Sequence, residues 1–236
     1  MPDYGLYVIT ADVADLGRSH LEIAEAALAA GVRTIQFRDK NMTTRELLET
    51  ASVLRQRTRQ AGARLFVNDR VDVALAVEAD GVHLGPDDMP VAAARRLARH
   101  TSGGLRLGAS AGTVEEAIAA AEAGADYLGV GSVFATDTKP DAGDPIGLEG
   151  LRKIAAATRL PVIAIGGITR ENAASVIDAG ADGAAVIRAV VRAPDMTVAA
   201  RDLLEVVRRA RSRAESATPP HRRRTSRSPA NDARGA

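Results

Sequence analysis

The sequence of 236 residues predicts an α/β fold, a closed (β/α)8 or TIM barrel that forms a single domain. Short runs rich in β-branched residues alternate with longer segments of helical period, as in parallel sheets covered by helices. Hydrophobic residues make up 46% of the chain and aromatic residues only 3%, so the core must consist mainly of Val, Ile, Leu and Ala. Eight strand-like runs occur, and no Gly-x-Gly-x-x-Gly follows the first, which favours the barrel over an open doubly wound sheet.

The expected strands are short apolar runs at residues 6–10, 34–39, 64–69, 81–85, 106–110, 127–132, 161–167 and 183–189. Helix-length segments follow them, including residues 19–30, 44–61, 114–123, 148–157, 171–179 and 197–211. Thr43 with Glu46 and Thr113 with Glu116 have the spacing of a capping box at a helix start. Glycines stand where four of the helices should end, at Gly31, Gly62, Gly124 and Gly180.

An Ala-Asp pair recurs between the end of an expected helix and the start of the next strand. It is found at Ala79-Asp80, Ala125-Asp126 and Ala181-Asp182. Reuse of one strand–helix unit at intervals is typical of a barrel assembled from similar units. The repeat therefore supports a count of eight units.

The barrel is placed at residues 1–211, and residues 212–236 are expected to form a disordered Arg/Ser/Pro-rich tail. The tail holds six Arg against two acidic residues, whereas residues 1–211 hold 25 basic and 28 acidic side chains. Because the tail has almost no large apolar residues, it cannot bury enough surface to fold. The run Arg222-Arg223-Arg224 is compatible with a nucleic-acid-binding arm, but a solvated tail is the interpretation we favour, and no nucleic-acid partner is expected.

Composition excludes several classes of protein. There is no cysteine, so disulfides, thiolate metal sites and cysteine nucleophiles are ruled out. The first residues show no signal-peptide pattern, and no stretch approaches the roughly 18 apolar residues of a membrane span. We therefore expect a cytoplasmic protein without a membrane partner. A homo-oligomer is compatible with the sequence, which does not define the oligomeric state.

In such a barrel the reacting groups come from the carboxyl ends of the strands and from the loops that follow. The second expected strand ends in Gln36-Phe37-Arg38-Asp39-Lys40. Alternation sends Gln36, Arg38 and Lys40 to one side, and Phe37 and Asp39 to the other. An amide and two cations at a strand end suit a polyanion, although an exposed strand end with ordinary salt bridges would contain the same residues.

Carboxylates follow the third and fourth expected strands, at Asp69 and at Asp87-Asp88. Carboxylates on neighbouring loops of one face repel each other unless a cation lies between them. Asp69 and one of Asp87 and Asp88 are therefore candidate ligands of Mg²⁺. Capping of the next helices by Asp69 and Asp88 explains the same residues equally well. His83, inside the fourth strand, is interpreted as a packed, hydrogen-bonded histidine and is given no chemical role.

Phosphate-binding features follow the last three strands. The loop after the sixth strand contains Thr136, Thr138 and Lys139 and is long enough to be a lid or a binding loop. Lysine is rare in this chain, with three Lys against 28 Arg, so a retained Lys suggests a need for a compact ammonium. The pair Gly166-Gly167 after the seventh strand is typical of a phosphate cradle. Two anion pockets indicate two phosphorylated substrates or one doubly phosphorylated substrate.

Taken together and in order, these segments resemble thiamine phosphate synthases. The resemblance covers about residues 6–200 and rests on residues 36–40 (QFRDK), 67–70 (VNDR), 81–88 (GVHLGPDD), 108–110 (GAS), 126–131 (DYLGVG), 136–139 (TDTK) and 164–168 (AIGGI). It implies a (β/α)8 transferase of thiamine biosynthesis. The substrates would be 4-amino-2-methyl-5-(diphosphooxymethyl)pyrimidine and a (carboxy)thiazole phosphate, the products thiamine phosphate, diphosphate and CO2, and the cofactor Mg²⁺.

Carried over by position, the resemblance implies three groups of residues. The pyrimidine diphosphate would be bound by Gln36, Phe37, Arg38, Asp39, Lys40, Asn68, Ser110 and Lys139. The thiazole phosphate would be bound by Thr136, Thr138, Gly167, Ile187 and Arg188. Mg²⁺ would be bound by Asp69 and Asp88, and the catalytic residues would be Lys139, Ser110 and Arg38. The implied mechanism is dissociative: diphosphate leaves first, and the thiazole nitrogen captures the resulting cation.

Three positions depart from the family pattern. Phe37 replaces the commoner Leu and Pro86 the commoner Gln, and neither change should remove chemistry. Arg188 stands where a Ser is often found, so it either adds a phosphate contact or points elsewhere. Two alternatives of the same barrel family are a thiazole tautomerase, which lacks the diphosphate chemistry, and a non-catalytic regulator that binds thiamine metabolites. The residues at the ends of the second to fourth strands argue against the tautomerase.

Overall fold

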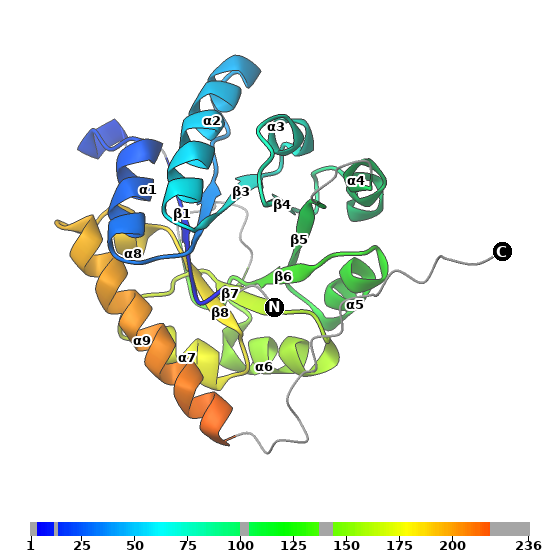
Figure 1. Cartoon of the computed structure of the whole chain (residues 1–236). Coiled ribbons are helices and arrows are strands. Elements are labelled where there is room, and N and C mark those ends of the chain that lie inside the picture. The colour runs from blue at the N-terminus through cyan, green and yellow to red at the C-terminus, as the bar shows by residue number, and fades with distance from the viewer. Residues whose placement is uncertain (1–3, 12–13, 100–103, 137–143, 218–236) are drawn as a thin grey trace, which may run out of the picture.

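Eight parallel strands form a closed barrel in chain order (Figure 1). The computed structural model describes residues 4–11, 14–99, 104–136 and 144–217. The strands are β1 (Leu6–Ile9), β2 (Thr34–Phe37), β3 (Arg64–Asn68), β4 (Gly81–Leu84), β5 (Arg106–Ala111), β6 (Tyr127–Val130), β7 (Val162–Ile165) and β8 (Gly183–Val186). Because β1 pairs with both β2 and β8, the predicted (β/α)8 barrel is confirmed, and the carboxyl ends of all strands share one rim.

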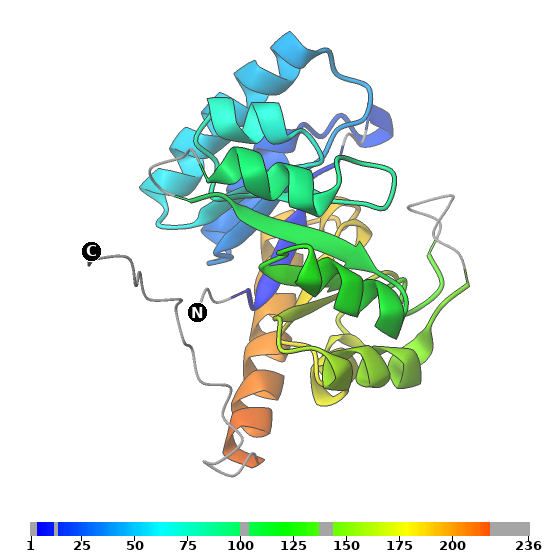
Figure 2. The ribbon, with the colours of Figure 1, turned by 90° about the vertical axis from the view of Figure 1, so that its right-hand side faces the viewer.

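Helices surround the strands (Figure 1). They are α1 (His20–Ala29), α2 (Thr44–Gln60), α3 (Val71–Ala76), α4 (Val91–Ala98), α5 (Val114–Glu122), α6 (Gly147–Ala157), α7 (Ala173–Asp178), α8 (Arg188–Val191) and α9 (Met196–Ala217), with a 3-10 helix at Ala14–Leu16. α9 packs along α1 and α7, and its last turns extend past the rest of the barrel (Figure 2).

α9 continues to Ala217, past the barrel boundary that the sequence places at residue 211. Ion pairs at helical spacing join Glu205 to Arg208 and Arg209, and Arg213 reaches Asp178 of α7. Such pairs support a helix on its exposed side. Residues 218–236, with Arg222, Arg223 and Arg224, lie outside the described residues.

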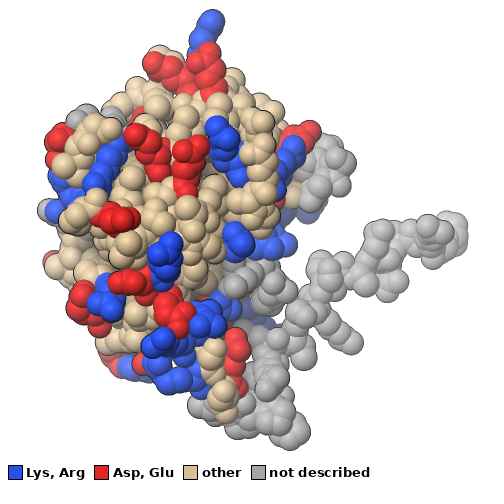
Figure 3. Space-filling view, turned by 60° about the vertical axis from the view of Figure 1, so that its left-hand side comes forward, with Lys and Arg blue, Asp and Glu red and all other residues tan. Residues whose placement is uncertain are grey.

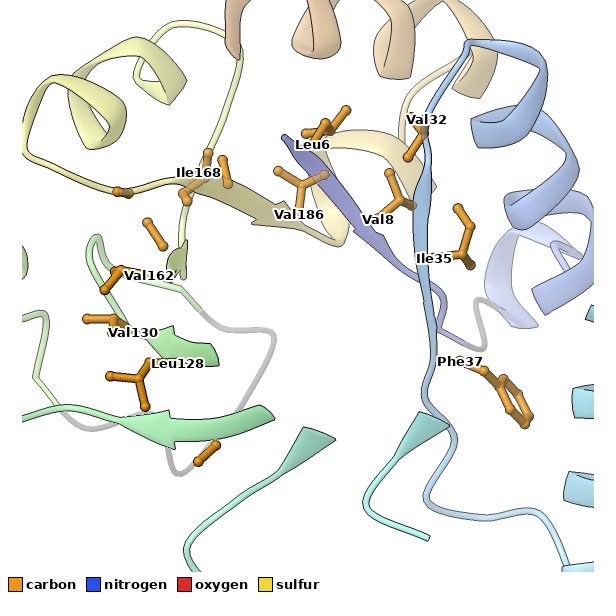
Figure 4. Packing of buried hydrophobic residues seen from close by; sticks show 14 of the residues in the cluster. Leu6, Val8, Val32, Ile35, Phe37, Leu128, Val130, Val162, Ile168 and Val186 are labelled. Atoms are coloured by element: carbon orange, nitrogen blue, oxygen red, sulfur yellow. The ribbon is translucent and has the colours of Figure 1, made fainter. Parts of the chain in front are cut away.

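Alternation along the strands separates two faces. Outward side chains pack against the helices in the main core, and Figure 4 shows Ile35, Phe37 and Leu128 among them. Inward side chains form a second cluster inside the barrel: Tyr4, Tyr7, Ile9, Phe66, Tyr127, Ile163 and Ala185. All three tyrosines of this aromatic-poor chain therefore lie in the barrel interior.

Glycines in three strands make room for the inner rings. A Cβ at Gly108 would lie 2.1 Å from Cζ of Tyr127, and one at Gly81 would lie 2.4 Å from Cε1 of Phe66. A Cβ at Gly129 would lie 2.7 Å from Cε1 of the His83 ring. These distances are far below van der Waals contact, so the space of the missing side chains is already filled by aromatic rings.

The recurring Ala-Asp pair has a structural role. In each case one carboxylate oxygen accepts a backbone N–H from the first or second residue of the preceding strand at 2.7–2.8 Å. The pairs are Asp80 with Leu65, Asp126 with Leu107, and Asp182 with Val162. The carboxylate ties neighbouring strands together at the bottom of the barrel, so the repeat marks a unit of two strands.

Local signals set most helix boundaries. Thr43 and Glu46 form the predicted capping box at the start of α2. At α5 only half of the predicted box forms, because Thr113 accepts the Glu116 N–H while the Glu116 carboxylate accepts the N–H of Gly112 at 2.6 Å. The glycines predicted to end helices all have positive φ: Gly31, Gly62, Gly124 and Gly180.

The eighth strand is shorter than the sequence predicts. A strand to residue 189 is expected, but β8 ends at Val186 and the backbone of Ile187 has left the β region, with φ −119° and ψ −81°. The turn into α8 buries Val190 and Val191 under α9. Arg188 is therefore the first residue of a short helix at the rim.

Acidic and basic side chains are interspersed on the face shown in Figure 3. Ion pairs occur between surface side chains, such as that between Arg192 and Asp15. On this face the charges of the described residues do not form a broad region of one sign (Figure 3). None of the described helices combines the length and the apolar character that crossing a membrane requires.

We predict that Gly108→Ala destabilises the barrel by about 1–3 kcal/mol, because the added Cβ overlaps the buried ring of Tyr127. Gly112→Ala is the matched control, since its nearest neighbour would lie 3.6 Å away, and it should change stability by less than about 0.5 kcal/mol. Urea unfolding measures both. Equal midpoints would contradict this account of the barrel interior.

Candidate active site at the carboxyl-terminal rim

A buried histidine–aspartate pair holds the loop after β2. One oxygen of Asp39 lies 3.0 Å from Nε2 of His20, on α1, and the other accepts the backbone N–H groups of Asn41 and Met42 at 2.7 and 2.8 Å. The other ring nitrogen of His20 lies 2.8 Å from the Thr10 hydroxyl. The Asp39 side chain is only 5% exposed. Its carboxylate therefore faces α1 and fixes the loop.

These contacts keep Asp39 ionised. Burial would raise its pKa, but the hydrogen bonds from Asn41, Met42 and His20 more than offset burial, and the pKa lies below its ordinary value. Both carboxylate oxygens are already engaged, so the contacts do not support Asp39 as a direct ligand of a diphosphate. Its role is to position the backbone that carries Arg38 and Lys40.

Phe37 is also turned away from the rim. It is 1% exposed, lies in the outward core and meets the His20 ring edge-on, with ring centroids 4.9 Å apart. The position of this side chain does not support a contact with the pyrimidine diphosphate, and the contact stays a prediction. Alternation explains the orientation, since it places Phe37 on the helix side of β2 (Figure 4).

Two carboxylates at the rim share one cation. The Lys40 ammonium, after β2, contacts the Asp69 carboxylate, after β3, and lies 3.9 Å from Oδ1 of Asp88, after β4. Asn68 donates from Nδ2 to the Asp69 carboxylate at 3.0 Å, and the N–H of Gly85 donates to Oδ2 of Asp88 at 2.7 Å. Residues far apart in the sequence thus form one polar cluster.

Two further observations bear on this cluster. Asp69 has φ 62°, a left-handed conformation that non-glycine residues seldom adopt and that is often found at functional sites. Asp69 and Asp88 do not cap the helices that follow them, which is the alternative explanation for these residues. The N-cap residues of α3 and α4 are Arg70 and Pro90, and neither helix has a side-chain capping bond.

The donor set fits Mg²⁺ bound together with a phosphorylated ligand. In the part of the chain that the structure describes, no three His, Cys, Asp or Glu side chains gather as a complete metal site. Asp69 and Asp88 supply two carboxylates, and Mg²⁺ commonly takes one or two, with phosphate oxygens and water completing its shell. The Lys40 ammonium contacts Asp69 and lies 3.9 Å from Asp88, so the two carboxylates already face a positive charge.

A cavity of about 270 Å³ joins the loops after β2 and β8. Arg38 and Lys40 line it from one side, and Ile187 and Arg188 from the other. The remaining lining residues are Ala11, Asp15, Asp39, Asn41, Val191 and Arg192. Both strands neighbour β1 in the barrel, which is why residues from opposite ends of the domain share one cationic cavity.

A chain of hydrogen bonds crosses the barrel below this rim. Gln36 donates from Nε2 to the Tyr7 hydroxyl at 3.0 Å, and the hydroxyls of Tyr7 and Tyr127 lie 3.1 Å apart. His83 places Nδ1 3.2 Å from the Tyr127 hydroxyl and Nε2 3.1 Å from the Ser110 hydroxyl. His83 is thus packed and hydrogen-bonded. The site prediction misses both tyrosines, although inward alternation along β1 and β6 is a signal for them.

The glycine pair after β7 has a packing role. Gly166 and Gly167 have φ 99° and 61°. Cβ atoms there would lie 2.6 Å from Cα of Ser132 and 2.5 Å from the carbonyl oxygen of Ala135, both in the loop after β6. Close approach of the two loops therefore requires glycine, whether or not a phosphate binds. Of the predicted thiazole-phosphate residues in the loop after β6, Thr136 is described, whereas Thr138 lies outside the described residues, as does Lys139.

The sequence profile of the family described as thiamine monophosphate synthase matches residues 6–190, which include all eight strands. The chain belongs to the thiamine monophosphate synthase family. The thiamine-phosphate synthase of Chloroflexus aurantiacus is 56% identical over 205 residues, which are 87% of this chain and 93% of that protein. That of Moorella thermoacetica is 54% identical over 213 residues, 90% of this chain and 100% of the relative.

A solved structure of a family member has the same fold. The thiamine phosphate pyrophosphorylase from Pyrococcus furiosus superposes with a TM-score of 0.80 at 48% sequence identity, over 88% of this chain and 97% of that one. The two proteins therefore have the same barrel over nearly their whole length.

We predict that Asp39→Ala destabilises this family member by about 1–3 kcal/mol at pH 7, because the buried His20 ring and two backbone N–H groups of the loop lose their hydrogen-bond partner. The pKa of Asp39 is lowered by folding, so its contribution is complete above the unfolded pKa of about 3.9 and is lost as the pH falls through the lower folded value. Urea midpoints from pH 7 downward should show a constant gap to wild type that closes only in acid.

The exposed Asp87 provides the control for this measurement. Asp87→Ala should alter stability by less than about 0.5 kcal/mol. If Asp39→Ala were as stable as Asp87→Ala at pH 7, Asp39 would not hold the loop.

Proposed function

We propose that this chain is a thiamine phosphate synthase, a transferase that joins the pyrimidine diphosphate to the thiazole phosphate. The observation that carries the proposal is the cluster at one rim: Lys40 bridges Asp69 and Asp88, and Arg38 lies beside it in a cavity shared with Arg188. Cations that surround a pair of carboxylates suit a metal-bound diphosphate. Curated relatives more than half identical over most of the chain carry the same name.

The pyrimidine diphosphate would lie over β2 to β5. Arg38 and Lys40 supply positive charge for the two phosphoryl groups, and Asn68 adds an amide beside Asp69. Mg²⁺, held by Asp69 and Asp88, would neutralise charge on the departing diphosphate. Gln36 and Ser110 stand at the two ends of the hydrogen-bond chain below and would meet the pyrimidine ring.

The thiazole phosphate would lie toward β6, β7 and β8. Thr136, Thr138, Gly167, Ile187 and Arg188 are the residues proposed to bind it. Arg188 is exposed and lines the same cavity as Arg38. Its guanidinium would therefore contact a phosphate bound between the two arginines. The family pattern often has Ser here, and Arg would add charge to the contact.

The reaction requires little covalent chemistry from the protein. The C–O bond to the diphosphate breaks with its electron pair on oxygen, and the thiazole nitrogen forms the new C–N bond to the pyrimidine methylene carbon. When the thiazole carries a carboxylate, that group leaves as CO2. Arg38, Lys40 and Lys139 would stabilise charge that develops on the leaving group, and fixed charges of this kind are an efficient form of catalysis. No protein nucleophile is needed.

Incubation of the purified protein with both heterocycles and Mg²⁺ tests the proposal. We expect thiamine phosphate and diphosphate to appear only when both substrates are present. Isomerisation of the thiazole alone would identify a tautomerase, and binding of thiamine metabolites without turnover would identify a regulator. Either of those results would overturn the proposal.

We predict that Asp69→Asn lowers turnover by about tenfold or more and weakens its dependence on Mg²⁺. Asn is the appropriate replacement because it tolerates the left-handed backbone at this position, which Ala would strain. Initial rates against Mg²⁺ concentration provide the measurement. Asp87→Ala serves as the control, because Asp88 and not Asp87 approaches Lys40. An unchanged Mg²⁺ profile in Asp69→Asn would remove Asp69 from the metal site.

We predict that Lys139→Ala lowers kcat by about tenfold or more while the circular dichroism spectrum is unchanged. Lys153→Ala is the matched control, because this exposed lysine on α6 lies 4.0 Å from Glu149. Its substitution should leave kcat within about twofold of wild type. Normal kinetics in Lys139→Ala would show that this lysine is not part of the site.

A further inference from the structure

We propose that the hydrogen-bond chain inside the barrel has a fixed direction, which makes the Ser110 hydroxyl a donor toward the substrate. In this view Tyr7, Tyr127 and His83 are positioning residues that act through Gln36 and Ser110. The identity of the ligand rests on the proposed function, whereas the direction of the chain is a property of the protein alone.

The part of this hydrogen-bond chain formed by Gln36, Tyr7 and Tyr127 is buried. Tyr7 and Gln36 are 2% exposed and Tyr127 is 0% exposed, whereas Ser110 opens to solvent at the rim. Burial raises the pKa of the hydroxyls of Tyr7 and Tyr127 well above the ordinary value, so both remain protonated at neutral pH. Each phenol therefore has one proton to donate, and a buried donor without an acceptor is costly.

The amide of Gln36 sets the direction. Its Nε2 donates to the Tyr7 oxygen, so the Tyr7 proton has Tyr127 as its acceptor. Among the described residues the Tyr7 hydroxyl contacts only Gln36 and Tyr127, so a proton donated from Tyr127 to Tyr7 would leave the Tyr7 proton without an acceptor. Tyr127 must then donate onward to Nδ1 of His83.

This order fixes the tautomer of His83. Nδ1 accepts from Tyr127, so the ring proton is on Nε2, which faces the Ser110 oxygen at 3.1 Å. Ser110 accepts that bond and keeps its own proton for a ligand at the rim. If the Gln36 amide were flipped, so that its oxygen faced Tyr7, every hydrogen bond would change direction. His83 would then carry its proton on Nδ1, and the Ser110 hydroxyl would donate to Nε2 of His83.

The consequence is a requirement on the ligand. The atom that faces Ser110 must accept a hydrogen bond, as a pyridine-type nitrogen of a pyrimidine ring does, whereas an N–H or O–H group there would meet another donor. At the other end of the chain, Gln36 uses its nitrogen on Tyr7 and has its carbonyl oxygen as an acceptor for an amino group. The pattern suits an aminopyrimidine and discriminates against its deaminated form.

Close packing fixes the rings that form this hydrogen-bond chain. Gly129 leaves space for the His83 ring, and Gly108 leaves space for the Tyr127 ring, at positions where a Cβ would overlap them. The Tyr127 ring is also held by Phe66, with centroids 5.5 Å apart in an edge-on arrangement. The donor and acceptor atoms are thus placed by rigid contacts on the strands.

Tyr4 offers a matched control for Tyr127. Its ring lies against Tyr127, with centroids 5.0 Å apart, and its hydroxyl is not hydrogen-bonded to Tyr7, Tyr127 or His83. Tyr4→Phe and Tyr127→Phe each remove one hydroxyl from the aromatic cluster inside the barrel. Only Tyr127→Phe interrupts the hydrogen-bond chain.

Nitrogen-15 NMR of the histidine rings in the ligand-free protein tests the direction without any assay of activity. We expect wild-type His83 to carry its proton on Nε2, with Nδ1 as a hydrogen-bonded acceptor. In Tyr127→Phe the Nδ1 resonance should shift because the bond from the Tyr127 hydroxyl is lost, and in Tyr4→Phe it should not move. A proton on Nδ1 in wild type, or rapid averaging of both tautomers, would overturn the inference.

Steady-state kinetics test the consequence for binding. Tyr127→Phe should raise the KM for the pyrimidine diphosphate by about tenfold and leave that for the thiazole phosphate within about twofold, because one oriented hydrogen bond is lost on one substrate. Tyr4→Phe should change neither, and thermal unfolding checks that both variants fold. Wild-type kinetics in Tyr127→Phe would overturn the positioning role. An inactive wild type whose His83 is protonated on Nε2 would refute the proposed function and leave the direction of the chain standing.

Discussion

The parallel strands pair all the way round, from β1 through β8 and back to β1, and this closure is the constraint on which the site depends. Because every strand runs in the same direction, every carboxyl end reaches the same rim. Lys40, Asp69 and Asp88 follow three successive strands and meet there. Arg38 and Arg188 come from opposite ends of the domain and line one cavity because their strands both flank β1. An open sheet of the same elements would separate them.

The interior of the barrel supports this rim from below. The protein has few aromatic residues, yet its three tyrosines all lie inside the barrel, and Gly108 leaves the space that the Tyr127 ring fills. Their hydroxyls are costly to bury unless they are paired, and two of them are paired in a chain that ends at Gln36 and Ser110. Packing and polarity therefore act together: the rings fill the core, and the hydroxyls orient the groups at the rim.

The sequence predicts the parts of this structure that local patterns encode. Strand positions, the glycines that end helices and the alternation at β2 all follow from short-range rules. The helix at Arg188 is not predicted, because the apolar run after β8 reads as strand and only packing under α9 selects a helix. The contacts of Asp39 and Phe37 with His20 are not predicted, because His20 comes from a helix earlier in the sequence. The contact of Lys40 with both carboxylates depends on barrel closure, which no local pattern measures.

The central claim is that Asp69 and Asp88 hold a metal whose diphosphate ligand is bound by the cations at the rim. A crystal structure with Mn²⁺ in place of Mg²⁺ and with the pyrimidine diphosphate bound tests this claim most directly, because the anomalous signal locates the metal independently of the surrounding density. The account predicts one anomalous peak in contact with both carboxylates, with Lys40 moved from Asp69 onto the diphosphate. A peak remote from both carboxylates, or Lys40 still between them with the diphosphate bound elsewhere, would contradict it.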